Sequence, residues 1–387
     1  MINQNFNFSI SHNIIFGAGK ITELSKVIET YGKKVLIVRT PLEKNISKVI
    51  NIIEKANKEW ISYTVEHEPT IVTIDDVVKS AREFNTELVI ALGGGSVIDT
   101  GKAVSALLAN PGQLIDYLEV VGKGLPLQKR SVPLIAIPTT AGTGSEVTRN
   151  AVIEVPEKKV KVSLRGLFIQ PEVALVDPEF TLSVPAQVTA YSGMDALIQV
   201  IEPYVSIKAN QMTDIFCREG IKCAAASLLK AYSDGNDLSA RINMSWVSLL
   251  GGICLANAGL GAVHGFAGPI GGMFHIPHGA ICASLLPTVM EVNIIALQQR
   301  DPDSISIDRY QEIFQIVTGN PNASILAGLN WFRELQAKLQ IPSLRKLGIS
   351  KNNFLDIIGQ SKIASSMKAN PILLNDDELN EILEKSF

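Results

Sequence analysis

The chain has 387 residues, of which 46% are hydrophobic and 19% charged, and a formal net charge of −3. This length predicts two domains, and the composition supports packed cores and argues against disorder. The lack of a Lys/Arg cluster argues against nucleic acid as a partner, because phosphate binding requires one. We also expect a cytoplasmic protein, since the N-terminus has no secretory pattern and the cysteines have no CxxC spacing. We expect no membrane span, since no segment reaches the apolar length that a bilayer requires.

The first half of the chain alternates apolar runs with helix-like stretches. The runs typical of strands are residues 34–38, 60–65, 87–95 and 133–140, and the helix-like stretches are residues 21–32, 47–57 and 73–85. Such alternation predicts a parallel sheet with helices on both faces. In sheets of this kind, ligands bind at the carboxyl ends of the strands.

The pattern changes after about Asp177, where strand signals fade and helical periodicity continues to the end of the chain. We therefore expect an α/β domain over residues 1–180 and an all-helical domain over residues 181–387. Residues 174–185 would form the connection between them.

Three glycines, Gly93–Gly95, stand with Ser96 between an apolar strand and a helix. Glycine lets a ligand approach the backbone closely, and the first N–H groups of a helix favour an anion. The segment predicts a pyrophosphate site, although its GGGSxxD spacing differs from the usual GxGxxG fingerprint. A tight strand-to-helix turn without a ligand is the alternative.

A second polar loop, within residues 137–153, follows the next strand and holds four Thr, one Ser and two Gly between positions 139 and 150. Hydroxyl and exposed N–H groups at the carboxyl end of a strand suit the recognition of ribose and amide groups. A polar surface loop would have the same composition. Two neighbouring strands that both carry polar loops to one crevice favour ligand binding.

One acid and two histidines, Asp195, His264 and His278, lie in apolar, glycine-rich sequence of the second half. Titratable groups are costly to bury without a partner, and a carboxylate with two imidazoles is typical of a catalytic Zn or Fe(II) site. Gln199 follows Asp195 by four residues and shares its helix face. The alternative is two satisfied core histidines and a capping aspartate, and His275 is either a proton relay or a surface residue.

The motifs together resemble the iron-containing (group III) alcohol dehydrogenase family. They are GGGSVIDTGKA (93–103), IPTTAGTGSEVT (137–148), GMDAL (193–197) and HGFAGPIGGMFHIPHG (264–279). The resemblance covers nearly the whole chain and implies an N-terminal Rossmann-like dinucleotide-binding domain followed by a helical metal-binding and substrate domain. It implies metal ligands at Asp195, His264 and His278, which would also be the catalytic residues. It implies cofactor contacts from Gly94, Gly95, Ser96, Asp99, Thr139, Thr140, Thr143, Ser145, Asn150 and Lys161.

Three positions depart from the family's pattern. The family's usual second histidine ligand, four residues after the aspartate, is Gln199 here, whose amide oxygen is a weaker ligand than imidazole. Gly268 stands where another histidine is often found. Arg39 ends the first strand where many NAD-using members carry an aspartate, and a guanidinium there can pair with a 2′-phosphate. This favours NADP(H), with NAD(H) open and a solvated strand-end charge as the alternative.

The resemblance implies reversible hydride transfer between NAD(P)(H) and a small alcohol, aldehyde or polyol, with one divalent metal, Fe²⁺ or Zn²⁺, bound by Asp195, Gln199, His264 and His278. We expect a homodimer. The alternatives are a metal-free reductase of the maleylacetate reductase type, a non-redox cyclase or synthase of the same superfamily, and a catalytically silent nucleotide-binding protein.

Overall fold

The computed structural model describes residues 5–41 and 43–387, which form two compact units. The α/β unit comprises Ile10–Thr140 and Gly144–Val184. The helical unit comprises Ala141–Thr143, Pro185–Phe387 and the described residues of Met1–Ser9. The expected fold class, a parallel α/β region followed by an all-helical region, is confirmed.

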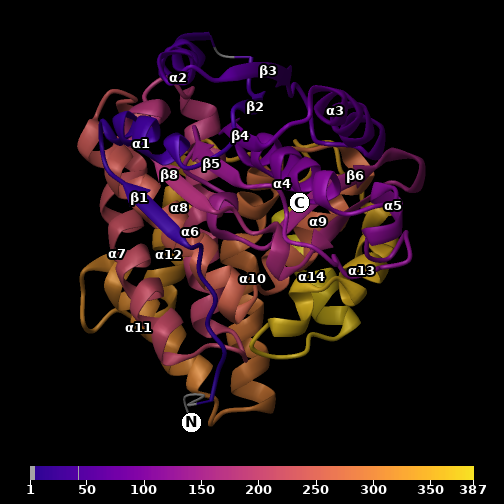
Figure 1. The fold of residues 1–387 in the computed structure, drawn as a ribbon. Coiled ribbons are helices and arrows are strands. Elements are labelled where there is room, and N and C mark those ends of the chain that lie inside the picture. The colour runs from indigo at the N-terminus through magenta and orange to yellow at the C-terminus, as the bar shows by residue number, and fades with distance from the viewer. Residues whose placement is uncertain (1–4, 42) are drawn as a thin grey trace. The chain divides into compact units, whose positions relative to one another are not determined.

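The α/β unit is built on a six-stranded sheet in the order β1-β8-β5-β4-β2-β3, and every pair in it is parallel (Figure 1). Its strands are β1 (Asn13–Phe16), β2 (Lys34–Arg39), β3 (Glu59–Thr64), β4 (Leu88–Gly93), β5 (Leu134–Pro138) and β8 (Val173–Val176). A separate antiparallel pair consists of β6 (Asn150–Val155) and β7 (Val160–Arg165). The helices of the α/β unit are α1 (Leu24–Glu29), α2 (Glu43–Lys55), α3 (Ile71–Phe84), α4 (Gly95–Ala109) and α5 (Leu114–Tyr117).

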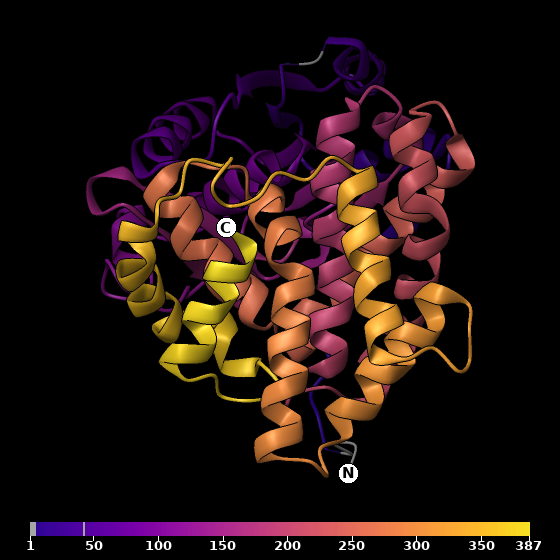
Figure 2. The same ribbon diagram turned by 180° about the vertical axis from the view of Figure 1, so that it is seen from behind.

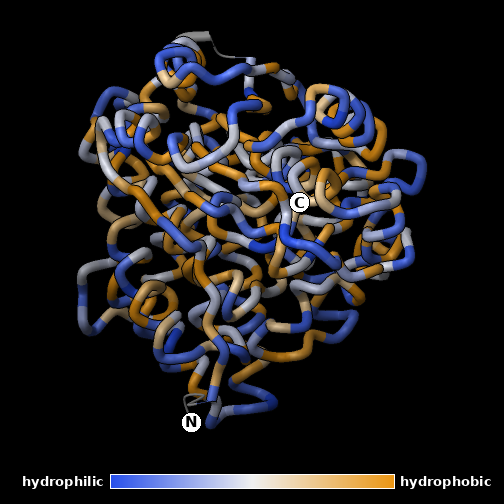
Figure 3. Tube along the Cα trace, viewed as in Figure 1, coloured by the Kyte–Doolittle hydropathy of each residue, from blue (hydrophilic) through white to orange (hydrophobic). Residues whose placement is uncertain are grey.

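The two faces of this sheet have separate cores, because successive strand residues point to opposite sides. Leu36 and Val38 pack with apolar residues of α3 and α4, whereas Val35 and Ile37 pack with those of α1 and α2. The helices are amphipathic to match, and the trace of α3 changes between hydrophilic and hydrophobic colour along its length (Figure 3). The strands β2 and β4 are therefore covered on both faces, which explains their nearly continuous apolar sequence.

The segment expected to be a connection, residues 174–185, contributes to the sheet. β8 pairs with both β1 and β5, so residues 174–176 belong to an interior strand. Asp177 follows it and accepts hydrogen bonds from the backbone N–H groups of Gly19 and Ile21, at 3.1 and 2.9 Å. The boundary expected between residues 180 and 181 falls inside the short helix η5 (Pro178–Thr181).

In the helical unit the long helices stand beside one another (Figure 2). They are α6 (Ala186–Val205), α7 (Gln211–Ser233), α8 (Leu238–Ala258), α9 (Ala262–Phe274), α10 (His278–Arg300), α11 (Ile305–Thr318), α12 (Ile325–Lys338), α13 (Phe354–Ile363) and α14 (Asp376–Ser386). α6 packs against α7, α8 and α10 and is buried over most of its length. Polar residues on α6 therefore lie in the core, where each needs a partner.

Two helices are long and apolar enough to span a membrane by length and composition, contrary to the expectation that no segment would be. They are Leu238–Ala258 and His278–Arg300. Within their apolar windows, 67% and 89% of the residues are buried inside the protein. Core helices of a globular fold have this pattern, because their apolar surface is covered by neighbouring helices.

Candidate functional site

Three helices of the helical unit bring the predicted metal ligands together. Asp195 lies on α6, His264 on α9, and His278 is the first residue of α10. Glycine beside His278 permits this approach, because a Cβ at Gly279 would lie 2.4 Å from the backbone oxygen of Tyr191 on α6. The start of α10 can therefore rest directly against α6.

The ligand atoms of this cluster are close to one another. His264 Nε2 lies 3.2 Å from Asp195 Oδ1, and His278 Nε2 lies 3.8 Å from the same oxygen. Asp195 and His264 are buried, and the side chain of His278 is 34% exposed. A carboxylate oxygen and two imidazole nitrogens at this spacing fit a divalent cation.

Glu202, one turn beyond Gln199 on α6, orients the histidine of α9. Its carboxylate accepts hydrogen bonds from His264 Nδ1 at 2.6 Å and from the backbone N–H of Val263 at 2.7 Å. With Nδ1 held in this way, Nε2 faces Asp195. A carboxylate behind a ligating histidine fixes the ring and increases its basicity. Sequence reasoning did not identify Glu202, although its spacing of seven residues from Asp195 indicates the same helix face.

The cluster attracts positive charge. Burial lowers the pKa of His264, but the carboxylates of Glu202 and Asp195 outweigh this and raise the pKa to about 10. Burial raises the pKa of Asp195, but hydrogen bonding to His264 and attraction to both histidines hold it below its usual value. A proton on His264 or a bound cation would supply the charge that the two carboxylates require.

Gln199 contacts the cluster through its amide nitrogen, which donates to Asp195 Oδ2 at 2.9 Å. Its amide oxygen is buried and has no hydrogen-bond partner. Burying such an oxygen unpaired costs roughly 1–3 kcal/mol. This unpaired amide oxygen, beside a carboxylate and two imidazoles, is a further atom that a bound cation would satisfy.

A further possible ligand, Cys282, was not identified from the sequence. It lies one turn after His278 on α10, and its Sγ is 3.5 Å from His278 Nε2. Potential ligand atoms of Asp195, His264, His278 and Cys282 all lie within 4.8 Å of one another. Burial raises the pKa of the Cys282 thiol, as do the carboxylates of Asp195 and Glu202. The i,i+4 spacing from His278 is the sequence signal that could have identified this residue.

His275 is not one of the clustered residues. His275 is exposed at the C-terminus of α9 in the left-handed region, with φ 54°. A Cβ at Gly268 would meet no atom within 4 Å.

In the α/β unit, the two polar loops lie side by side at the carboxyl ends of β4 and β5. Thr139 N–H donates to the carbonyl of Gly93 at 3.0 Å, and a Cβ at Gly94 would lie 3.4 Å from Thr140 Oγ1. α4 begins at Gly95, and no side chain caps its N-terminus. Such an arrangement suits an anionic ligand at the start of the helix.

Asp99 and Ser145, both predicted to bind cofactor, belong to a buried network around Lys102. The Ser145 hydroxyl donates to Asp99 Oδ1 at 2.5 Å, and the N–H of Val152 donates to Asp99 Oδ2 at 3.0 Å. Lys102 donates to Ser145 Oγ, Thr148 Oγ1 and the carbonyl of Asn150, each at 2.8 Å. This network joins α4 to the second polar loop and to β6.

The charges of this network are perturbed by burial. Lys102 is fully buried, and its Nζ lies 3.7 Å from Asp99 Oδ1. Burial lowers the pKa of Lys102 to about 8, although the negative charges of Asp99 and Glu146 act to raise it. Burial raises the pKa of Glu146 to about 7. Sequence reasoning missed Lys102, although a lysine in an otherwise apolar helix is a signal of a buried, paired cation.

The other predicted cofactor residues are placed as follows. Asn150 begins β6, and its own backbone carbonyl accepts the hydrogen bond from Lys102. Lys161 on β7 is nearly buried, and its ammonium lies 3.2 Å from Glu68. Ser96 is in the first turn of α4, whereas Thr143 groups with the helical unit.

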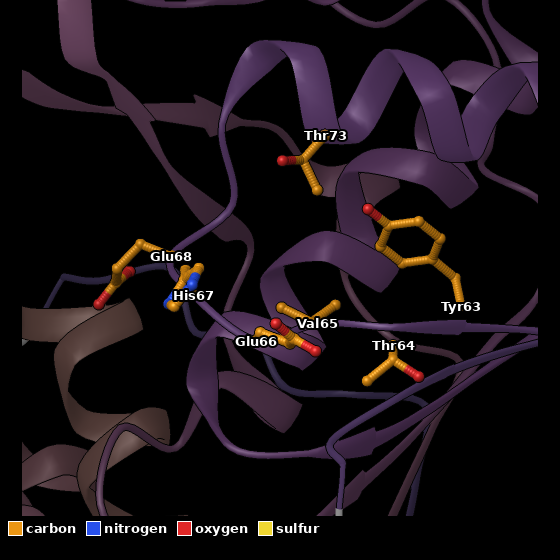
Figure 4. A pocket seen from close by; sticks show the side chains of 7 residues that line it. All are labelled: Tyr63, Thr64, Val65, Glu66, His67, Glu68 and Thr73. Atoms are coloured by element: carbon orange, nitrogen blue, oxygen red, sulfur yellow. The ribbon is translucent and has the colours of Figure 1, made fainter.

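Arg39 ends β2, where it is in register with Thr64 of β3. Its guanidinium makes a hydrogen bond of 3.4 Å to the carbonyl of Thr40. Just beyond the end of β3 is a pocket of about 240 Å³, drawn in Figure 4. The side chains that line it belong to Tyr63, Thr64, Val65, Glu66, His67, Glu68 and Thr73. A pocket at the carboxyl edge of a parallel sheet has the position expected of a ligand site.

Comparisons with known proteins agree along the whole chain. Residues 11–178 match the family described as iron-containing alcohol dehydrogenase, and residues 189–387 match the C-terminal region of the Fe-containing alcohol dehydrogenase family. The chain is 33% identical over 383 residues to alcohol dehydrogenase 4 of Saccharomyces cerevisiae (strain YJM789), covering 96% of each protein. It is 32% identical over 390 residues to the NADPH-dependent butanol dehydrogenase of Clostridium saccharobutylicum, covering 97% of each. A crystal structure of 1,3-propanediol oxidoreductase matches with a TM-score of 0.91 at 29% identity, over 99% of this chain and 100% of that one.

Proposed function

Because the chain belongs to the iron-containing alcohol dehydrogenase family, we propose that it catalyses reversible hydride transfer between NAD(P)(H) and a small alcohol, aldehyde or polyol. The observation that carries this proposal is the cluster of the buried Asp195 and His264 with the partly exposed His278, supported behind His264 by Glu202. A divalent ion there would supply Lewis-acid stabilisation of charge on the substrate oxygen, while the nicotinamide carries the hydride.

The residues of the helical unit would hold the ion and set its position. Asp195, His264 and His278 offer the ligand atoms, and Gln199 steadies Asp195 through its amide N–H. Glu202 keeps His264 Nε2 directed at the cluster. This preorganisation means that the ligands need little rearrangement as charge develops on the substrate.

The α/β unit would bind the dinucleotide. The uncapped start of α4, at Gly94, Gly95 and Ser96, suits the pyrophosphate. Thr139 and Thr140 on the neighbouring loop would contact the rest of the cofactor, as would Thr143, Asn150 and Lys161. Asp99 and Ser145 would act by holding this loop against α4, since their oxygens are engaged in the Lys102 network. The Arg39 guanidinium supports a preference for NADP(H).

A metal-removal assay tests the proposal. Nicotinamide absorbance would be followed with 1-butanol, 1,3-propanediol and the matching aldehydes, before and after chelation and after addition of Fe²⁺ or Zn²⁺. We expect chelation to abolish turnover and one of the two ions to restore it. Full activity in protein shown by elemental assay to be metal-free would instead support a metal-free reductase. Tight cofactor binding without turnover over a broad panel would support a nucleotide-binding protein.

Two further features belong to the proposal. We expect a cytoplasmic homodimer, and exposed apolar side chains such as Ile207 and Ile215, each 62% exposed, offer surface that a partner subunit would cover. Light scattering on the purified protein would measure the mass, and a monomer at micromolar concentration would contradict this expectation.

A further inference from the structure

We propose that Cys282 is a ligand of the metal ion, in the place that a histidine four residues after Asp195 would otherwise take, and that it makes the site selective for Zn²⁺. The inference rests on the metal-binding part of the proposed function. It assigns a ligand set of Asp195, His264, His278 and Cys282.

The first observation is the spacing of the candidate donors. A tetrahedral zinc site with bonds of about 2.0–2.3 Å has edges of roughly 3.3–3.6 Å between its ligand atoms. Asp195 Oδ1 and His264 Nε2 are 3.2 Å apart, and His278 Nε2 and Cys282 Sγ are 3.5 Å apart. The edge between Asp195 and His278 is 3.8 Å. Small side-chain rotations would bring all four atoms to one ion.

The second observation concerns Gln199. Its amide N–H donates to Asp195, and its buried oxygen has no hydrogen-bond partner. An unpaired polar atom at this place indicates that the site is incomplete without a cation. Because an amide oxygen is a weak ligand, Gln199 would add only a secondary contact to the ion while its N–H orients Asp195, and Cys282 would supply the fourth strong ligand.

The third observation is the position of Cys282 in the fold. It is completely buried on the face of α10 that carries His278, one turn along the helix. Backbone geometry therefore delivers both side chains to the same point. When the ion binds, the sulfur loses its proton to solvent and coordinates as thiolate.

A thiolate changes which ion the site prefers. Soft sulfur ligands favour zinc, whereas carboxylate, carbonyl and water ligands suit Mg²⁺ and Mn²⁺. With Cys282 as the fourth donor, the site has two nitrogens, one oxygen and one sulfur, and the substrate oxygen would bind as an additional, fifth ligand, an expansion that zinc allows. We therefore expect Zn²⁺ to bind much more tightly than Mn²⁺, and the margin to depend on Cys282.

The test uses full-length protein, stripped of metal and reloaded with Co²⁺ or Zn²⁺. We expect Co²⁺-loaded wild-type protein to show a sulfur-to-cobalt charge-transfer band, and zinc-edge X-ray absorption to find one sulfur at about 2.3 Å. Cys282→Ser should lose the band. It should also lower the ratio of Zn²⁺ affinity to Mn²⁺ affinity by at least ~10-fold, because mutating even a residue that only supports a metal ligand weakens metal binding by about that factor. Cys254→Ala, which removes an equally buried thiol near Thr213, should change neither.

Two results would overturn the inference, and they have different meanings. Bound Co²⁺ without a charge-transfer band, together with unchanged affinities in Cys282→Ser, would exclude sulfur ligation and leave the proposed dehydrogenase intact. Failure of wild-type protein to bind Co²⁺ or Zn²⁺ at all would overturn the metal-dependent function as well. The spectra of wild-type protein decide the matter even if Cys282→Ser does not fold.

Discussion

The two units each contain a buried polar cluster, and the clusters differ in how completely they are paired. Around Lys102 in the α/β unit, the ammonium has three hydrogen-bond acceptors, and both oxygens of Asp99 accept hydrogen bonds. Around Asp195 in the helical unit, the Gln199 oxygen is unpaired and two imidazole nitrogens converge on one carboxylate oxygen. A closed network of this kind stabilises a fold, whereas an open one is suited to a ligand.

This difference predicts that the clusters respond oppositely to mutation. Removing a member of the open cluster should affect chemistry more than stability. Removing a member of the closed network should affect stability first, since buried charges then lose their partners.

The largest effect is expected for His264→Ala. Loss of this ligand should lower kcat by about 10³-fold, comparable with the loss of a main electrostatic contact to the transition state. Cofactor affinity should stay close to wild type, because the dinucleotide residues belong mainly to the other unit. Steady-state kinetics and a fluorescence titration with NAD(P)H would measure the two quantities. A wild-type rate in this variant would show that His264 is not a ligand of the catalytic metal.

Lys102→Met should destabilise the α/β unit by about 3–5 kcal/mol, because it leaves the Asp99 carboxylate buried without its cation. Urea unfolding followed by circular dichroism would measure the change. Lys79→Met, on an exposed position of α3, is the matched control and should stay within about 0.5 kcal/mol of wild type. Equal stability of the two variants would mean that the Lys102 network is not structural.

Glu146→Gln tests the same network through pH. The pKa of Glu146 is raised from 4.5 to about 7 in the fold, so the folded state holds the proton more tightly than the unfolded chain. Stability from this group is therefore present below about pH 4.5 and is lost as pH rises to about 7, on the order of 3 kcal/mol. Unfolding midpoints between pH 5 and 7 should fall less in Glu146→Gln than in wild type. Glu157→Gln, at an exposed position, should keep the wild-type slope.

The contacts of the closed network around Lys102 could not be predicted from the sequence, whereas most strands of the sheet could. The strands β2, β4 and β5 were predictable because each is a run of apolar residues next to turn signals, and β3 because its residues are mostly aromatic or β-branched. β1 has only four residues, and its strand state depends on pairing with β8, which no local pattern reports. The clustering of the metal candidates followed from buried charge in apolar sequence. The acceptors of Lys102 come from a loop about 45 residues away, so only the fold identifies them.

The smallest effect is expected at the edge of the α/β unit, where a partly buried strand-end charge rather than a buried cluster would select the cofactor. Arg39→Asp replaces a guanidinium that can pair with a 2′-phosphate by a carboxylate that repels it and can accept from a ribose hydroxyl. The ratio of kcat/KM for NADP(H) over NAD(H) should fall about 10-fold, corresponding to roughly 1.4 kcal/mol. Lys33→Asp makes the same change of charge at the exposed residue just before β2, beyond the strand's opposite end, and should leave the ratio unchanged. If both variants give the wild-type ratio, Arg39 is a solvated strand-end charge. If both shift it equally, long-range electrostatics rather than a local contact determines the preference, because a specific ion pair acts only at the carboxyl end of the strand.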